Sequence, residues 1–128
     1  MPDDTPIQGE LQIQIMQTVW RNGPGSVEEI RSALPARYRG AYNTIQTVLN
    51  RLSERGLLTR TKQGNAMQYA PTMDEAGYLS LTLKRTLAGA SREAQNAALA
   101  ALLGNMDRDE RSDLQRRAKR IADRQQKP

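Results

Sequence analysis

Residues 26–55 read SVEEIRSALPARYRGAYNTIQTVLNRLSER, and this stretch predicts two helices joined by a tight turn. Ser26 and Glu29 form a capping box, in which each side chain accepts a hydrogen bond from the other residue's backbone N–H. Pro35 ends the first helix. The second helix spans about Ala41 to Arg55, and its apolar stripe has helical spacing. That stripe consists of Ile45, Val48, Leu49 and Leu52.

The segments on either side complete a winged helix-turn-helix. A helix from about Glu10 to Arg21 precedes the stretch and stops at Asn22-Gly23-Pro24-Gly25. Two extended segments follow it, Leu57–Lys62 and Ala66–Pro71, joined through Gln63-Gly64-Asn65 as a hairpin. Three helices followed by a hairpin are the order that a winged helix uses. We therefore predict a mainly α fold with a β wing.

The predicted DNA-binding domain covers residues 7–72, and a helical dimerisation region covers residues 73–124. Residues 1–6 are predicted to be disordered and residues 125–128 to form a frayed tail. In the helix predicted over Asp74–Leu87, leucines point to two sides, and one chain of this size offers little to cover both. The side chains assigned to dimerisation are Leu79, Leu81, Leu83, Leu87, Leu99, Leu102, Leu103, Leu114 and Ile121.

The composition argues against catalysis and metal binding. The 128 residues include no Cys and no His, which removes disulfides, thiolate sites, the usual zinc ligands and the commonest general base. A site made only of Asp and Glu stays open. We predict no enzyme activity, no catalytic residues, no metal and no cofactor. No apolar run approaches the roughly 20 residues of a membrane span, and the start is acidic, so we expect a soluble cytoplasmic protein.

The outer face of the helix over 41–55 carries short polar side chains. Asn and Gln can pair with adenine, and the methyl group of Thr can contact thymine. An ordinary solvated face would more often hold Lys and Glu, which favour helix formation. We predict base reading by Asn43, Thr44, Gln46 and Thr47, with Asn50 and Glu54 further along the same face.

Positive charge gathers around this face. The net charge of the chain is +5, and between residues 37 and 62 six cations stand against Glu54 alone. Such a patch suits a phosphate backbone or an anionic membrane surface, although a solvated face is an equally good reading of charge alone. For Tyr42, packing against the preceding helix is an alternative to DNA contact. The predicted contacts to the DNA backbone are Arg37, Arg39, Tyr42, Arg51, Arg60, Lys62 and Asn65.

Three stretches resemble the bacterial penicillinase and methicillin-resistance repressors of the BlaI/MecI/CopY type. Residues 11–20, LQIQIMQTVW, resemble the family's Leu-Glu-x-x-Val-Met-x-x-Leu-Trp opening. Residues 41–58, AYNTIQTVLNRLSERGLL, resemble its Tyr-x-Thr-Val-x-Thr-Val-Leu-x-Arg-Leu-x-x-Lys-Gly core. Residues 64–71, GNAMQYAP, resemble its wing. The resemblance runs from about Leu11 to Ile121.

The resemblance implies a homodimeric repressor with an intertwined three-helix dimerisation region. It also implies a double-stranded operator with dyad symmetry, commonly built on TACA/TGTA half-sites near β-lactamase or related genes. By matching position, residues 43, 44, 46 and 47 fall where family members contact bases, and Arg51 falls where a basic residue recurs.

The chain departs from the family pattern in three places. Gln12 stands where the family usually has Glu. The resemblance suggests a sensor protease as a partner, but the stretch around Ala101-Leu102-Leu103 lacks the Asn-Phe bond that staphylococcal members offer to it. The cysteine cluster of the copper-responsive branch is also missing. Two other functions stay open: a winged-helix module that binds an acidic protein, and a nucleic-acid binder without sequence preference.

Overall fold

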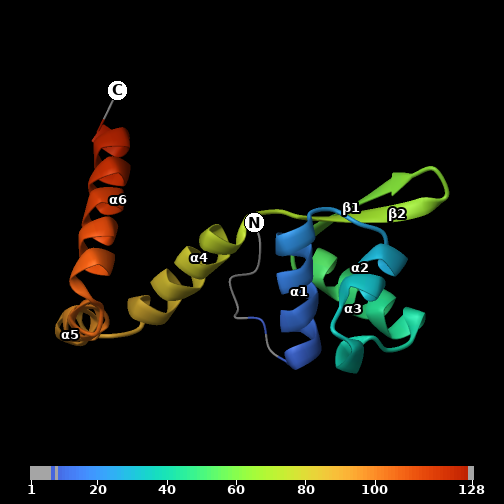
Figure 1. Ribbon diagram of the computed structural model, residues 1–128, viewed down its shortest axis with the longest axis horizontal. Helices are drawn as coiled ribbons and strands as arrows, with labels where there is room; N and C mark the ends of the chain where they lie inside the picture. The colour runs from blue at the N-terminus through green and yellow to red at the C-terminus, as the bar shows by residue number, and fades with distance from the viewer. Residues whose placement is uncertain (1–6, 8, 127–128) are drawn as a thin grey trace. The chain divides into compact units, whose positions relative to one another are not determined.

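The computed structural model describes residue 7 and residues 9–126 of the chain, in which helices predominate (Figure 1). The predicted disorder of residues 1–6 lies outside the described residues. A two-stranded antiparallel sheet is the β component in the described ranges, which confirms the mainly helical fold with a wing. The elements are α1 (Glu10–Asn22), α2 (Val27–Ala33), the 3-10 helix η1 (Ala36–Tyr38), α3 (Tyr42–Glu54), β1 (Leu58–Gln63), β2 (Ala66–Pro71), α4 (Glu75–Ala88), α5 (Arg92–Gly104) and α6 (Arg108–Gln126).

The start of α2 and the end of α3 form as their sequences predict. The Ser26 hydroxyl accepts a hydrogen bond from the Glu29 backbone N–H at 3.2 Å, and Glu29 Oε1 accepts one from the Ser26 N–H at 2.9 Å. These bonds satisfy two of the backbone donors that a helix leaves unpaired at its N-terminus. Gly56 follows α3 with a φ of +81°, a conformation that glycine adopts without steric cost.

The wing is the β1–β2 hairpin, which extends away from the three helices in Figure 1. Its register pairs Leu58 with Pro71 and Gln63 with Ala66. Gly25, just before α2, exchanges two backbone hydrogen bonds with Tyr69 of β2, at 3.0 and 2.8 Å. The base of the wing is therefore fixed to the segment that starts α2.

The chain divides into two compact units, one ending at Arg85 and the other beginning at Thr86. The division falls within α4. Tyr78, near the start of this helix, is buried in the core of the first unit. Its ring lies 5.4 Å from that of Trp20, and its hydroxyl accepts a hydrogen bond from the Ile7 N–H at 2.7 Å.

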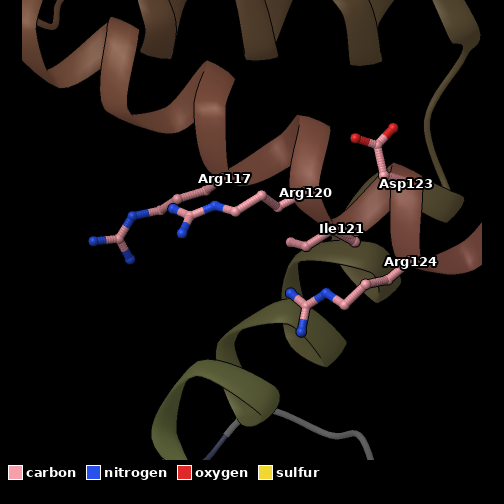
Figure 2. A pocket seen from close by; sticks show the side chains of 5 residues that line it. All are labelled: Arg117, Arg120, Ile121, Asp123 and Arg124. Carbon is pink, nitrogen blue, oxygen red and sulfur yellow. The ribbon is translucent and has the colours of Figure 1, made fainter.

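The second unit contains α5 and α6, and its described residues include no buried side chain. Ser91 accepts a hydrogen bond from the Ala94 N–H and so caps α5. On α6, Ile121 is half exposed among the side chains of Arg117, Arg120 and Arg124 (Figure 2). The helix continues through Gln126, into the segment for which we predicted a frayed end, because Arg and Gln are good helix formers. Residues 127 and 128 lie outside the described residues.

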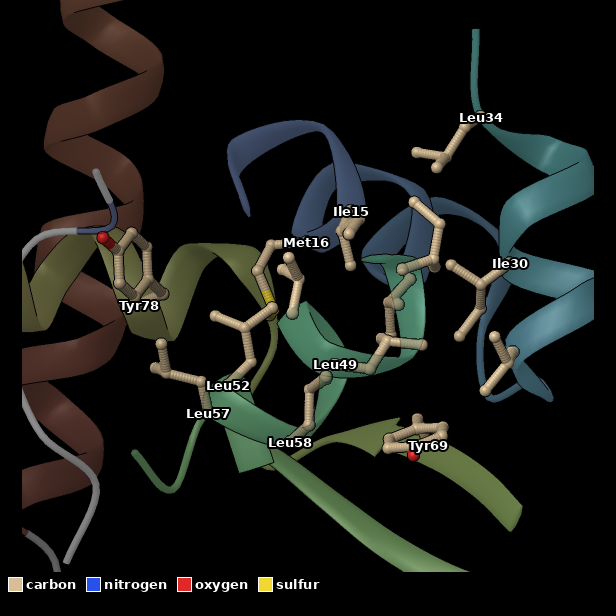
Figure 3. Close-up of a cluster of buried hydrophobic side chains, with 14 residues drawn as sticks. Ile15, Met16, Ile30, Leu34, Leu49, Leu52, Leu57, Leu58, Tyr69 and Tyr78 are labelled. Atoms are coloured by element: carbon tan, nitrogen blue, oxygen red, sulfur yellow. The ribbon is translucent and has the colours of Figure 1, made fainter. Parts of the chain in front are cut away.

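The hydrophobic core lies in the first unit (Figure 3). Trp20 packs at its edge and donates a hydrogen bond from Nε1 to the Met73 carbonyl at 3.1 Å, which satisfies its indole N–H. Among the described helices, none is long and apolar enough to cross a membrane. The core residues are Ile15, Met16, Val19, Val27, Ile30, Leu34, Ile45, Val48, Leu49, Leu52, Leu57, Leu58, Tyr69 and Tyr78.

Candidate nucleic-acid interface

Helix α3 has one buried face and one polar face. The predicted apolar stripe is buried, with Ile45, Leu49 and Leu52 fully covered. Asn43, Thr44 and Thr47 are exposed on the helix, and Gln46 is half-buried. The core therefore fixes the rotation of the helix about its axis, and that rotation presents three of the four predicted base-reading side chains to solvent.

Thr47 has its hydroxyl hydrogen engaged within the helix. Its Oγ1 donates to the Asn43 carbonyl at 2.8 Å, which is the usual bond of a threonine in a helix interior. This bond holds the side chain in one rotamer. What Thr47 presents outward is its methyl group and the hydroxyl lone pairs, a surface suited to a thymine methyl or to a base donor.

Several residues that we predicted to contact the DNA backbone are exposed around this face. Arg51 lies on α3, Lys62 lies on β1 and Asn65 lies in the wing turn, all exposed. Tyr42, the first residue of α3, is 46% exposed. The helix and the wing thus carry these polar and basic groups on the surface of one compact unit.

Arg37 belongs to an exposed cluster with α1. Its Nη2 lies 3.8 Å from Glu10 Oε2, and its guanidinium stands 4.9 Å above the Tyr38 ring. The Tyr38 hydroxyl donates to the same Glu10 oxygen at 2.7 Å, and this hydrogen bond raises the pKa of Tyr38. Exposed ion pairs contribute about 0–1 kcal/mol, so a phosphate can replace Glu10 at Arg37 with little loss.

Arg39 stabilises the turn between α2 and α3. Its Nη2 donates to the Leu34 carbonyl at 2.8 Å, at the C-terminal end of α2. Arg31 supports the same turn by donating from Nε to the Gly40 carbonyl at 2.7 Å. One hydrogen bond leaves Arg39 further N–H donors, since a guanidinium has five. The sequence showed the charge of Arg39 but not this structural role.

Asn50 has a structural role that its position on the polar face of α3 did not reveal. The structure turns its half-buried side chain toward the wing, where Oδ1 accepts two hydrogen bonds. One comes from the Tyr69 hydroxyl at 2.7 Å and the other from Arg60 Nη1 at 3.0 Å. Burial raises the pKa of Tyr69, while the nearby Arg60 guanidinium opposes that rise. Asn50 therefore joins α3 to both strands of the wing.

No cluster of three or more His, Cys, Asp or Glu side chains that could hold a metal ion occurs in the part of the chain that the structure describes. The described surface of the first unit instead offers polar and cationic groups around a helix that is anchored by its opposite face. This arrangement can bind an extended polyanion.

Residues 8–120 match the family model described as penicillinase repressor. The chain belongs to the penicillinase repressor family. It is 34% identical over 113 residues to the transcriptional regulator BlaI of Mycobacterium tuberculosis, an alignment that covers 84% of this chain and 80% of that protein. It is 28% identical over 76 residues to the penicillinase repressor of Bacillus licheniformis, with 59% of each chain covered. The family is one of transcriptional repressors, so the prediction that the chain is not an enzyme is confirmed.

Solved structures agree with the fold of this family member. The solution structure of the DNA-binding domain of the repressor BlaI matches with a TM-score of 0.51 and 28% identity, covering 59% of this chain and 92% of that domain. A transcriptional regulator from Thermotoga maritima matches with a TM-score of 0.50, covering 94% of this chain and 80% of that one. At 18% identity, this likeness concerns the fold alone.

Proposed function

We propose that this family member is a sequence-specific repressor that binds a dyad-symmetric DNA operator as a homodimer. The observation that carries the proposal is the polar face of α3, where Asn43 and Thr47 are exposed opposite a buried apolar stripe and Thr44 is exposed on the flank. A helix held by its core face and polar on the other face can enter the major groove without rearrangement.

Bases are read by the N-terminal half of α3. Asn43 and Gln46 carry amides that match adenine, while Thr44 and Thr47 offer hydroxyl oxygens and methyl groups. Phosphate contacts then fix the register of the helix in the groove without reading sequence. The residues proposed for those contacts are Arg37, Arg39, Tyr42, Arg51, Arg60, Lys62 and Asn65.

The second unit supports dimerisation. Leu99, Leu102, Leu103, Leu114 and Ile121 are exposed on α5 and α6 of a single chain. Water-exposed apolar side chains in such number are typical of a surface that another chain covers. Once one subunit holds its half-site, the other meets the second half-site at high effective concentration. The bound dimer blocks the promoter sterically.

Our proposal for the regulated genes rests on the name of a relative. A relative is named a penicillinase repressor, and we propose that this chain controls β-lactamase or related genes. A sensor protease that cuts at Asn-Phe is not a partner that this sequence supports, because no such dipeptide occurs in it.

The test is a binding titration of the full chain on duplex DNA from its own upstream region and on a shuffled duplex, at two salt concentrations. Tight binding to the upstream duplex alone, weakening with salt, is expected. Equal affinity for both duplexes would favour a binder without sequence preference. Binding to neither would favour a module that recognises an acidic protein.

A further inference from the structure

We propose that Asn50 is a positioning residue that holds Arg60 of the wing against α3, so that helix and wing contact the DNA backbone as one rigid unit. The inference rests on the proposed DNA-binding function and deepens it. It assigns to Asn50 a part in affinity and salt dependence, and no part in base preference.

The chemistry of the three side chains fixes the arrangement. A guanidinium carries only donors, so the Asn50 atom that faces Arg60 Nη1 must be the amide oxygen. The same oxygen accepts from the hydroxyl of Tyr69, a residue that is buried. Arg60 and Tyr69 are direct partners in the β1–β2 register. One oxygen of the helix therefore engages both strands at the same level of the wing.

A neutral acceptor suits this task better than a carboxylate. Asn50 orients Arg60 without cancelling its charge, and Arg60 keeps most of its N–H donors for a phosphate. A carboxylate lies close by, because Glu54 and Arg60 line the same groove of about 380 Å³ between α3 and β1. An Arg60 side chain released from Asn50 could pair with Glu54, and the wing would then offer less positive charge to DNA.

The experiment compares Asn50→Leu, Arg60→Ala and the double variant of the full chain, with Tyr69→Phe as the matched control. Asn50→Leu removes the acceptor of both hydrogen bonds at similar side-chain volume. Tyr69→Phe also removes a hydrogen bond from the cluster but leaves the Asn50–Arg60 bond in place. Each protein is titrated on the upstream and shuffled duplexes between 50 and 200 mM salt, and its thermal unfolding is recorded.

We expect Asn50→Leu and Arg60→Ala each to reduce the slope of log affinity against log salt by about 1. The affinity change between the two salt concentrations then shrinks roughly three- to fourfold, equally on both duplexes. The double variant should resemble Arg60→Ala, because Asn50 acts through Arg60. Tyr69→Phe should keep the slope of the unmodified chain. If Asn50→Leu does not fold, Asn50→Ser replaces it, since it leaves room for water at the Tyr69 hydroxyl.

An unchanged or steeper slope in the Asn50 variant would overturn the inference, as would full additivity of the two substitutions. A loss confined to the upstream duplex would also overturn it, because Asn50 would then read bases. If the unmodified chain binds neither duplex, the proposed function itself fails and this inference fails with it.

Discussion

The two units of the chain differ in how far they bury their apolar side chains. In the first unit, side chains from α1 through Tyr78 of α4 build a closed core. In the second unit, Leu99 is 43% exposed, Leu102 is 56% exposed and Ile121 is 50% exposed, and no described side chain is buried. The first unit therefore has a buried core, although Leu79 and Leu83 of α4 are exposed within it, whereas the described part of the second unit displays its apolar side chains to solvent.

The two units are suited to different tasks. A unit with its own core can hold a recognition helix in a fixed orientation. A unit whose leucines are exposed gains stability when a second surface covers them, at about 25 cal/mol for each Å² of apolar surface removed from water. In the proposed repressor, DNA reading belongs to the first unit, and dimerisation belongs to the open second unit together with Leu79, Leu81 and Leu83 of α4.

The largest effect is expected from Leu49→Ala in the closed core. Leu49 is fully buried, and truncation of such a leucine costs about 2–5 kcal/mol of unfolding free energy. Trp20, the single tryptophan, reports on the first unit, so urea unfolding followed by its fluorescence measures the loss. Leu102→Ala is the matched control and should barely move this transition. An equal shift in both variants would show that the second unit also stabilises the first.

Leu102→Asp tests whether the exposed leucines of the second unit form a dimer interface. A carboxylate buried without a partner at a subunit interface costs several kcal/mol, so we expect the proposed dimer to dissociate at least roughly a hundredfold more readily. Sedimentation velocity over a range of concentrations measures this. Asn96→Asp adds the same charge at an exposed position of α5 and should leave the dimer intact. A Leu102→Asp protein that sediments like the unmodified dimer would show that Leu102 lies outside the interface.

Thr47→Ala should lower discrimination between upstream and shuffled duplexes by about 1–3 kcal/mol without changing stability appreciably. Because the Thr47 hydroxyl hydrogen is engaged by the Asn43 carbonyl, we expect the methyl group to carry the contact. Thr47→Val should then retain discrimination and Thr47→Ser should lose it. Retention by Thr47→Ser instead would assign the contact to the hydroxyl lone pairs, and no change in Thr47→Ala would remove the residue from the reading face.

Most of the fold could be predicted because its signals are local in the sequence. The capping box of α2, the stripe of α3 and the hairpin turn each depend on residues within a few positions of one another. The end of the first unit could not be placed in this way. It depends on Tyr78 packing against Trp20, two residues from distant parts of the sequence.

The sequence was enough to predict which residues form the candidate site, but not which hydrogen bonds their side chains make. Periodicity places Asn43 and Thr47 on the outer face of α3, because the core fixes the rotation of the helix. It does not reveal that Arg39 donates to the Leu34 carbonyl or that Asn50 turns toward Tyr69 and Arg60. Such bonds depend on how the turn and the wing pack, which no single segment encodes.

The capping box offers a smaller, pH-dependent test within the closed unit. Hydrogen bonds from the backbone N–H and the hydroxyl of Ser26, together with Gln68, hold the pKa of Glu29 below its usual value. A lowered folded-state pKa stabilises the fold above the unfolded-state pKa, and that stability is lost as pH falls through the folded-state pKa. Glu29→Gln should therefore lose less stability than the unmodified chain between pH 7 and acidic pH, as measured by urea unfolding. Ser26→Ala should cost about 1 kcal/mol at pH 7. An unaltered pH dependence in Glu29→Gln would show that Glu29 does not contribute to acid sensitivity.

The smallest effect is expected from Glu54→Gln, which removes the carboxylate from the groove that Arg60 lines. Glu54 is exposed, so the gain in DNA affinity should stay below about 1 kcal/mol and should fade at high salt. The gain should be equal on upstream and shuffled duplexes if the groove meets the DNA backbone, as we propose, and not the bases. Glu93→Gln makes the same charge change on α5 of the second unit and should leave affinity unchanged. If both variants bind more tightly by the same amount, net charge alone is responsible. If only Glu54→Gln gains, the groove between α3 and the wing faces the phosphates.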